Sequence, residues 1–184
     1  MIRTATLFVI LLIPLVYLTY AVMIAQVNDP IKYIYSITGS TAIVILLLTT
    51  FISLIKKYVN LIKYRRMIGL YGFFYSLLHF LNFYVFDAEF KLDFVIKESL
   101  DKPFIYLGMI SFIILIFMAI TSKKTLYPKY YKYHRLLYVV LVLVTVHFTM
   151  AQKSLSITQW VYLSIIIILL CLKFRQKKNL LLKG

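Results

Sequence analysis

The stretch RRMIGLYGFFYSLLHFLNFYVFD, residues 65–87, decides the fold of this chain. Two arginines open it, and an apolar run with a single histidine, His79, follows. As a helix, a run of this length crosses the roughly 30 Å of hydrocarbon in a bilayer. Polar groups in hydrocarbon are costly and usually functional. The stretch therefore predicts a membrane-spanning helix that carries part of a functional site.

The composition of the whole chain agrees with a membrane protein. Of its 184 residues 62% are hydrophobic, and its mean hydropathy is +0.90, whereas soluble domains are about 45–50% apolar. Helix is required in lipid because open backbone groups find no partner there. We predict an all-α integral membrane protein in which residues 1–184 form a single domain of six spans. The expected spans are about 5–26, 34–55, 67–87, 104–122, 135–152 and 159–174.

Charge divides the connecting segments into two sides. One side carries 16 basic residues and no acidic residue, and the other carries five basic residues and all six acidic ones. The positive-inside rule predicts that the first side, with both termini, is cytoplasmic. The net charge of +15 then indicates loops that face anionic lipid, and it gives no support to nucleic-acid binding.

The segments outside the spans are too short for a nucleotide-binding domain. The only sizeable exterior segment, residues 87–102, has apolar residues spaced for a short amphipathic helix. Such a helix either docks an exterior partner or lies on the lipid headgroups. The single cysteine, Cys171, excludes an internal disulfide, and we interpret it as a small buried hydrophobe.

Two histidines fall at similar depths in separate spans. His79 lies about 12 Å inside Asp87, and His147 lies about 8 Å inside Gln152, both measured from the outer ends. One interpretation is that the two imidazoles bind a heme iron between them. The other is that each is a neutral histidine hydrogen-bonded across helices. A zinc site is less well supported because no cysteine or carboxylate is near to complete four ligands.

The third histidine, His134, lies at the inner edge of the membrane, 13 residues before His147. On an ideal helix the two side chains would point about 140° apart, so they cannot share one heme. His134 could bind a second heme with a weak partner, contact propionates, line a quinone or flavin pocket, or lie among the interfacial tyrosines. Three arginines share this inner face, where they either set the topology or pair with heme propionates or a flavin phosphate. They are Arg65, Arg66 and Arg135.

Three blocks of sequence carry a resemblance to a known family. They are RRMIGLYGFFYSLLHFLNFYVFD at 65–87, KPFIYLGMISFIILIFMAITS at 102–122 and YHRLLYVVLVLVTVHF at 133–148. These blocks resemble the ferric-reductase-like membrane domain and, more closely, the heme-binding membrane subunit of the bacterial periplasmic protein-methionine-sulfoxide reductase system. By matching motif positions, the resemblance implies that His79 and His147 are axial ligands of heme iron and that His134 is a candidate ligand of a second heme.

The resemblance also implies a function that spacing alone does not give. The family consists of heme b proteins of the bacterial inner membrane, with which flavin mononucleotide (FMN) is associated. They pass electrons from the quinol pool to a periplasmic molybdopterin-containing reductase subunit, which reduces methionine sulfoxide in proteins. A cytoplasmic flavin reductase is an alternative electron donor. The resemblance thus implies an electron-transfer subunit and not the catalytic one.

Two other functions are compatible with these residues. One is the membrane domain of a ferric or siderophore-iron reductase, which uses the same heme chemistry. The other is a small transporter or scaffold without redox activity, which would be colourless and would tolerate loss of His147.

Overall fold

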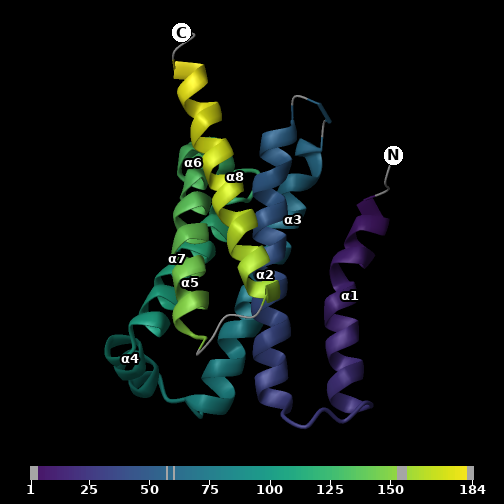
Figure 1. Ribbon diagram of the computed structural model, residues 1–184, viewed down its shortest axis with the longest axis vertical. Coiled ribbons are helices and arrows are strands. Elements are labelled where there is room, and N and C mark those ends of the chain that lie inside the picture. The colour runs from purple at the N-terminus through teal and green to yellow at the C-terminus, as the bar shows by residue number, and fades with distance from the viewer. Residues whose placement is uncertain (1–3, 57, 60, 153–156, 182–184) are drawn as a thin grey trace.

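The computed structural model describes residues 4–56, 58–59, 61–152 and 157–181, and its long elements are all helices (Figure 1). In chain order these are α1 (Thr4–Met23), α2 (Pro30–Ile55), α3 (Ile62–Asn82), the π-helical turn η1 (Phe83–Asp87), α4 (Leu92–Asp101), α5 (Pro103–Thr121), α6 (Tyr127–Tyr130), the 3₁₀ turn η2 (Tyr131–Leu136), α7 (Leu137–Met150) and α8 (Ile157–Leu181). Pro30 and Pro103 are the first residues of α2 and α5, where a missing N–H is tolerated.

Within the described residues, five helical segments are long and apolar enough to cross a membrane. They are α1, α2, α3 with η1, α5, and the segment from α6 to α7. The chain is therefore a multi-pass membrane protein. The sixth predicted span is present as α8, but its apolar part, Gln159–Lys173, is shorter than the other five. Six crossings and cytoplasmic termini stay predictions.

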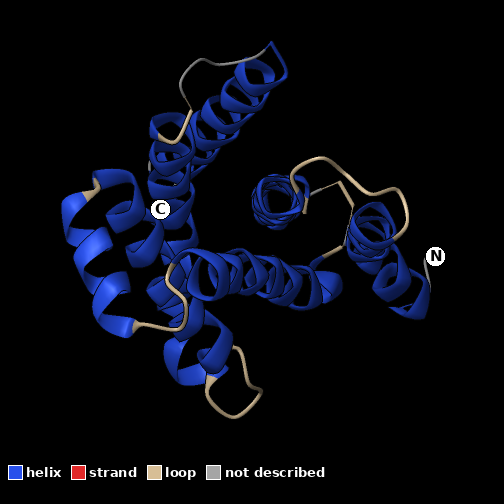
Figure 2. Ribbon diagram, turned by 90° about the horizontal axis from the view of Figure 1, so that it is seen from below, coloured by secondary structure: helices blue, strands red, loops and turns tan. Residues whose placement is uncertain are grey.

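Two helix pairs organise the bundle. The closest packing is between α2 and α3, followed by that between α5 and α7, and contacts between α3 and α5 join the pairs. Helix α2 is central because its buried residues serve two cores. Ile45 packs in a cluster with α1 and α3, and Leu46 packs in a second cluster with α5, α7 and α8. Figure 2 shows this arrangement from below, with α1 at the edge of the bundle.

Two tyrosines of α3 tie α1 to the bundle. Tyr75 is fully buried, and its hydroxyl donates to the carbonyl of Leu11 at 2.8 Å. Tyr71, one turn earlier, donates to the carbonyl of Phe8 at 3.3 Å. Each bond satisfies a buried phenol that would otherwise destabilise an apolar interior.

The structure differs from the sequence predictions in two places. The predicted span 135–152 begins in the last two residues of the 3₁₀ turn η2 and continues as α7, and the apolar helical segment extends further toward the N-terminus, to Tyr127. Cys171, predicted to be buried, is exposed on α8. The reason is that α8 packs on the bundle along one stripe only, where Leu163, Ile166 and Leu169 are buried.

Candidate functional site

The structure brings His79 and His147 together. His79 lies near the end of α3, and His147 lies in the last turn of α7. Their ring centres are 6.3 Å apart, and the ring planes are nearly perpendicular, at 87°. Two imidazoles bound at about 2 Å to opposite sides of one metal would have ring centres roughly 6 Å apart. The spacing therefore suits two ligands of a single metal.

Each histidine ring lies directly against a glycine of the neighbouring helix. A Cβ added to Gly39 of α2 would lie 2.9 Å from Cε1 of His79. A Cβ added to Gly108 of α5 would likewise lie 2.9 Å from Cε1 of His147. Real Cβ atoms essentially never approach so closely. Both glycines are thus required by close approach, and the two helix pairs hold their histidines in the same way.

The hydrogen bonds of the two rings leave the same nitrogen free in each. Nδ1 of His147 lies 2.6 Å from the carbonyl oxygen of Phe104, which can only accept, so this Nδ1 carries the proton. Nδ1 of His79 lies 3.3 Å from Oγ1 of Thr38, which donates its own proton to the carbonyl of Ile34. Oγ1 therefore accepts from Nδ1. Both Nε2 atoms are then unprotonated, which is the state in which imidazole binds a metal.

Aromatic and polar residues complete the surroundings of the pair. Tyr35 packs edge-on against His79 at 5.3 Å, and its hydroxyl donates to the carboxylate of Asp87. The ring centre of Phe104 lies 6.0 Å from that of His147. Asn82, one turn after His79, is buried and donates to the carbonyl of Ile31, which joins the start of α2 to the end of α3. These contacts fix the helices that carry the two histidines.

Among the described residues, no group of three or more histidine, cysteine or carboxylate side chains could hold a metal ion. Within this described part of the chain, the ligands that the site offers to a metal are the two imidazoles of His79 and His147. Two nitrogen ligands suit a metal whose remaining positions are filled by a macrocycle.

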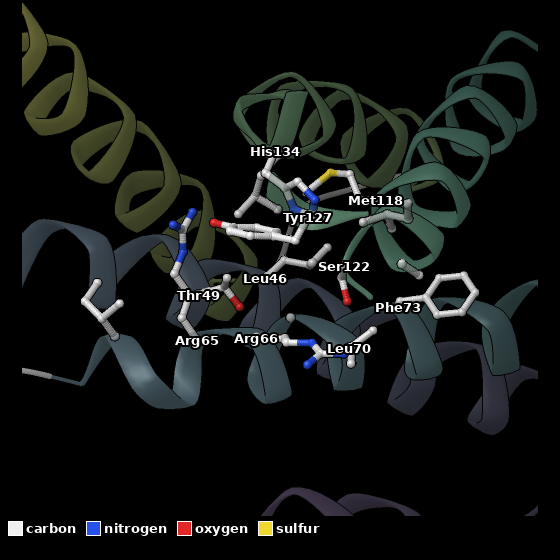
Figure 3. Close-up of a pocket in the computed structure, with 15 residues that line it drawn as sticks. Leu46, Thr49, Arg65, Arg66, Leu70, Phe73, Met118, Ser122, Tyr127 and His134 are labelled. Carbon is white, nitrogen blue, oxygen red and sulfur yellow. The ribbon is translucent and has the colours of Figure 1, made fainter. Parts of the chain in front are cut away.

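A second feature is a cavity of about 300 Å³ toward the end of the bundle that carries the basic residues. Figure 3 shows His134, Tyr127 and Met118 on one side of it, and Arg65, Arg66, Leu70 and Phe73 on the other. Its remaining lining is largely apolar, with residues of α2, α5 and α7. Two guanidinium groups beside an apolar floor suit a flat apolar ligand that carries negative charge.

His134 forms its hydrogen bond through Nε2, whereas His79 and His147 form theirs through Nδ1. Its Nε2 lies 3.2 Å from Oγ1 of Thr121, which itself donates to the carbonyl of Phe117 at 2.8 Å. Nε2 of His134 therefore carries the proton. The residue lies in η2, and a 3₁₀ turn advances by about 120° per residue, which reduces its angle to His147 from about 140° to about 80°. The 3₁₀ turn thus brings His134 closer to the side of the helix that carries His147, and His134 lines the cavity.

Comparisons with known proteins identify the family to which this chain belongs. The family described as ferric reductase like transmembrane component matches residues 38–145, more than half of the chain. Proteins of Brucella ovis, Brucella canis and Brucella melitensis are each 32% identical to it over 165 residues, which is 86% of this chain and 75% of theirs. Each is named protein-methionine-sulfoxide reductase heme-binding subunit MsrQ.

The chain belongs to the MsrQ family. The fold is accordingly that of a ferric-reductase-like membrane domain. In this MsrQ-family chain, the six residues expected at the site separate into three groups. His79 and His147 meet between the helix pairs, whereas His134, Arg65 and Arg66 line the cavity at the basic end of the bundle. Arg135 is exposed and is not among the residues that line that cavity.

Four residues of this MsrQ-family site were not anticipated from the sequence. They are Thr38 and Gly39 of α2, and Phe104 and Gly108 of α5, which support the two histidine rings. A glycine inside an apolar span is a general signal of close helix packing. It does not indicate which side chain packs there, and a backbone carbonyl such as that of Phe104 leaves no signal in the sequence.

Proposed function

We propose that this chain is a cytochrome b subunit of the bacterial inner membrane, and that it carries electrons outward to a methionine sulfoxide reductase. His79 and His147 would hold one heme b as axial ligands. The observation that carries the proposal is the pair of rings 6.3 Å apart, each with Nδ1 engaged and Nε2 free. The names of the MsrQ relatives support the choice of heme.

The residues around the pair determine what the site does. Heme iron with two nitrogen ligands supplies a one-electron carrier with no position open to substrate. Phe104 and Thr38 fix the tautomers, and Gly39 and Gly108 let each ring lie close to the neighbouring helix. The chain therefore transfers electrons and leaves the reduction of methionine sulfoxide to a periplasmic molybdopterin-containing partner.

The cavity at the basic end of the bundle is where electrons would enter. Arg65, Arg66 and His134 line it, and the basic face to which they belong is predicted to be cytoplasmic. A quinol headgroup, or FMN reduced by a cytoplasmic flavin reductase, would fit an apolar floor with cationic walls. Nε2 of His134 donates to Thr121 and is therefore not free to bind a metal. This hydrogen bond favours a role for His134 in the cavity over ligation of a second heme. The exposed Arg135 is left as a topology-setting charge.

The absorption spectrum of the purified protein tests the heme assignment. We expect a reducible, low-spin b-type spectrum that is lost in His79→Ala and in His147→Ala and retained in His134→Ala. Reconstituted vesicles should also reduce an exterior methionine sulfoxide reductase when quinol is supplied. A colourless wild-type protein, or a spectrum indifferent to both substitutions, would exclude the proposal and favour a membrane protein without redox activity.

A further inference from the structure

An apolar stripe is exposed on α4, the short helix between η1 and α5. Its members, which we call the α4 stripe, are Phe90, Leu92, Ile96 and Leu100. The last three are spaced by four residues and so share one helical face. The exposed fractions of these four side chains lie between 62% and 72%. So large a set of exposed apolar side chains on one short segment indicates a contact surface.

The opposite side of α4 is fixed to the protein. Val95 and Ser99 are buried, and α4 packs against α5. Ser99 also donates to the carbonyl of Val95 at 2.7 Å, so its hydroxyl is satisfied within the helix. In Figure 1 α4 lies at the side of the bundle away from α1. The helix is therefore anchored, with its stripe turned away from its own chain.

Phe90 is held in place before the helix begins. Glu89 and Phe90 both have a positive backbone φ, of 46° and 63°. Residues other than glycine rarely adopt this conformation. Tyr84 holds this turn, because its hydroxyl donates to the carbonyl of Phe90 and its carbonyl accepts from the N–H of Phe90, each at 3.0 Å. The aromatic ring is thus preorganised on the surface, which is how a contact residue loses little entropy on binding.

The charges around the stripe are acidic. Residues 87–102 contain five carboxylates and three lysines, and two of these lysines already pair with acids of the same segment. Glu89, 3.0 Å from Nζ of Lys91, raises the pKa of that ammonium, and Glu98 pairs with Lys102. Asp93, Lys97 and Asp101 are spaced by four residues on the flank of the stripe and are all exposed, so this flank carries two carboxylates and one ammonium. Helices that lie on lipid are typically rich in lysine and arginine, so these acids disfavour a headgroup-bound α4.

The stripe is also close in the chain to the histidine pair. Helix α4 ends at Asp101, and the carbonyl of Phe104 accepts the hydrogen bond from His147. A protein bound on α4 would lie next to the segment that supports this histidine. Small, transient contacts are typical of electron-transfer partners.

We infer that the α4 stripe is the docking surface for the exterior electron acceptor, a soluble protein with an apolar recess rimmed by lysine or arginine. The inference rests on the proposed function, since it assigns the exit side of the same electron carrier. The apolar residues would bind the recess, and the exposed aspartates would steer the basic rim and set the orientation.

Binding of the purified catalytic subunit of the methionine sulfoxide reductase system to the full chain in nanodiscs tests the inference. The double variant Ile96→Ser/Leu100→Ser should raise Kd at least tenfold with an unchanged heme spectrum. The double variant Asp93→Lys/Asp101→Lys should slow association and weaken its dependence on salt. Ile24→Ser is the matched control, because Ile24 follows α1, is 68% exposed and lies outside the proposed surface.

Three outcomes would overturn the inference, and only the last of them would also overturn the proposed function. If the wild type binds the catalytic subunit and the stripe variants bind it equally well, docking lies elsewhere and the proposed function stands. If the indole introduced by Ile96→Trp, in a Trp160→Phe background, is quenched by brominated phosphatidylcholine, the stripe lies in lipid. If the heme-loaded wild type neither binds the catalytic subunit nor reduces it, the proposed function fails together with the docking surface.

Discussion

Alanine substitution of the two glycines beneath the histidines is the sharpest test of the site. In Gly108→Ala the new Cβ would lie 2.9 Å from Cε1 and 3.0 Å from Nδ1 of His147. Ordinary contacts begin near 3.4 Å, so the ring has to retreat by about half an ångström or the helices have to separate. Retreat would disturb the 2.6 Å hydrogen bond to Phe104 that fixes the tautomer.

The expected loss follows from the supporting role of these contacts. Disturbing the groups that orient a metal ligand typically lowers metal affinity about 10–100-fold, and we expect a loss in this range for heme in Gly108→Ala and Gly39→Ala. Overpacking should also destabilise each variant by about 1–3 kcal/mol. Heme titration into the apoprotein measures the affinity, and thermal unfolding measures the stability.

The chain supplies its own controls on α3. A Cβ at Gly69 would meet only Cγ2 of Thr49, at 3.7 Å, so Gly69→Ala should bind heme normally and gain up to about 1 kcal/mol of helix stability. A Cβ at Gly72 would meet Leu46 at 2.8 Å, so Gly72→Ala should lower stability without selectively weakening heme binding. If Gly108→Ala bound heme as tightly as Gly69→Ala, the geometry assigned to His147 would be wrong.

Three further substitutions probe separate contacts. Thr38→Val removes the acceptor for Nδ1 of His79 and should weaken heme binding about tenfold in titrations, whereas Thr38→Ser keeps the hydroxyl and should bind heme as the wild type does. If Thr38→Val bound heme as tightly as the wild type, Thr38 would not set the tautomer of His79. His134→Gln should keep the full heme content and slow reduction by the electron donor in stopped-flow measurements, and loss of heme would instead make it a ligand. Tyr75→Phe removes a buried hydrogen bond to Leu11 and should cost about 1 kcal/mol in thermal unfolding with an unchanged spectrum, and an unchanged melting temperature would refute that bond.

The sequence predicted that His79 and His147 lie at similar depths because depth in a membrane can be counted along a helix, and the family resemblance favoured their pairing over two separate hydrogen-bonded histidines. Both residues lie a few turns from the outer ends of long apolar spans, and the fold brings their rings to 6.3 Å. Hydropathy predicted the helical membrane architecture, and the spacing of apolar residues predicted the short helix between residues 87 and 102.

The supports of the two rings could not be predicted from the sequence. Whether Gly39 faces a histidine depends on which helix packs against α2 and on its rotation, and apolar periodicity is weak in a helix that is apolar all round. The orientation of His134 depends on the 3₁₀ turn η2, since a continuous α-helix would have turned it further from His147. The carbonyl of Phe104 is a backbone group, which any residue would provide.

Electron paramagnetic resonance of the oxidised, heme-loaded protein tests the central claim most directly. We predict a low-spin ferric signal with two nitrogen axial ligands, lost in His79→Ala and in His147→Ala and unchanged in His134→Ala. A signal that survives the loss of His147, or one that depends on His134 instead, would contradict the assignment of the pair as the two ligands of one heme.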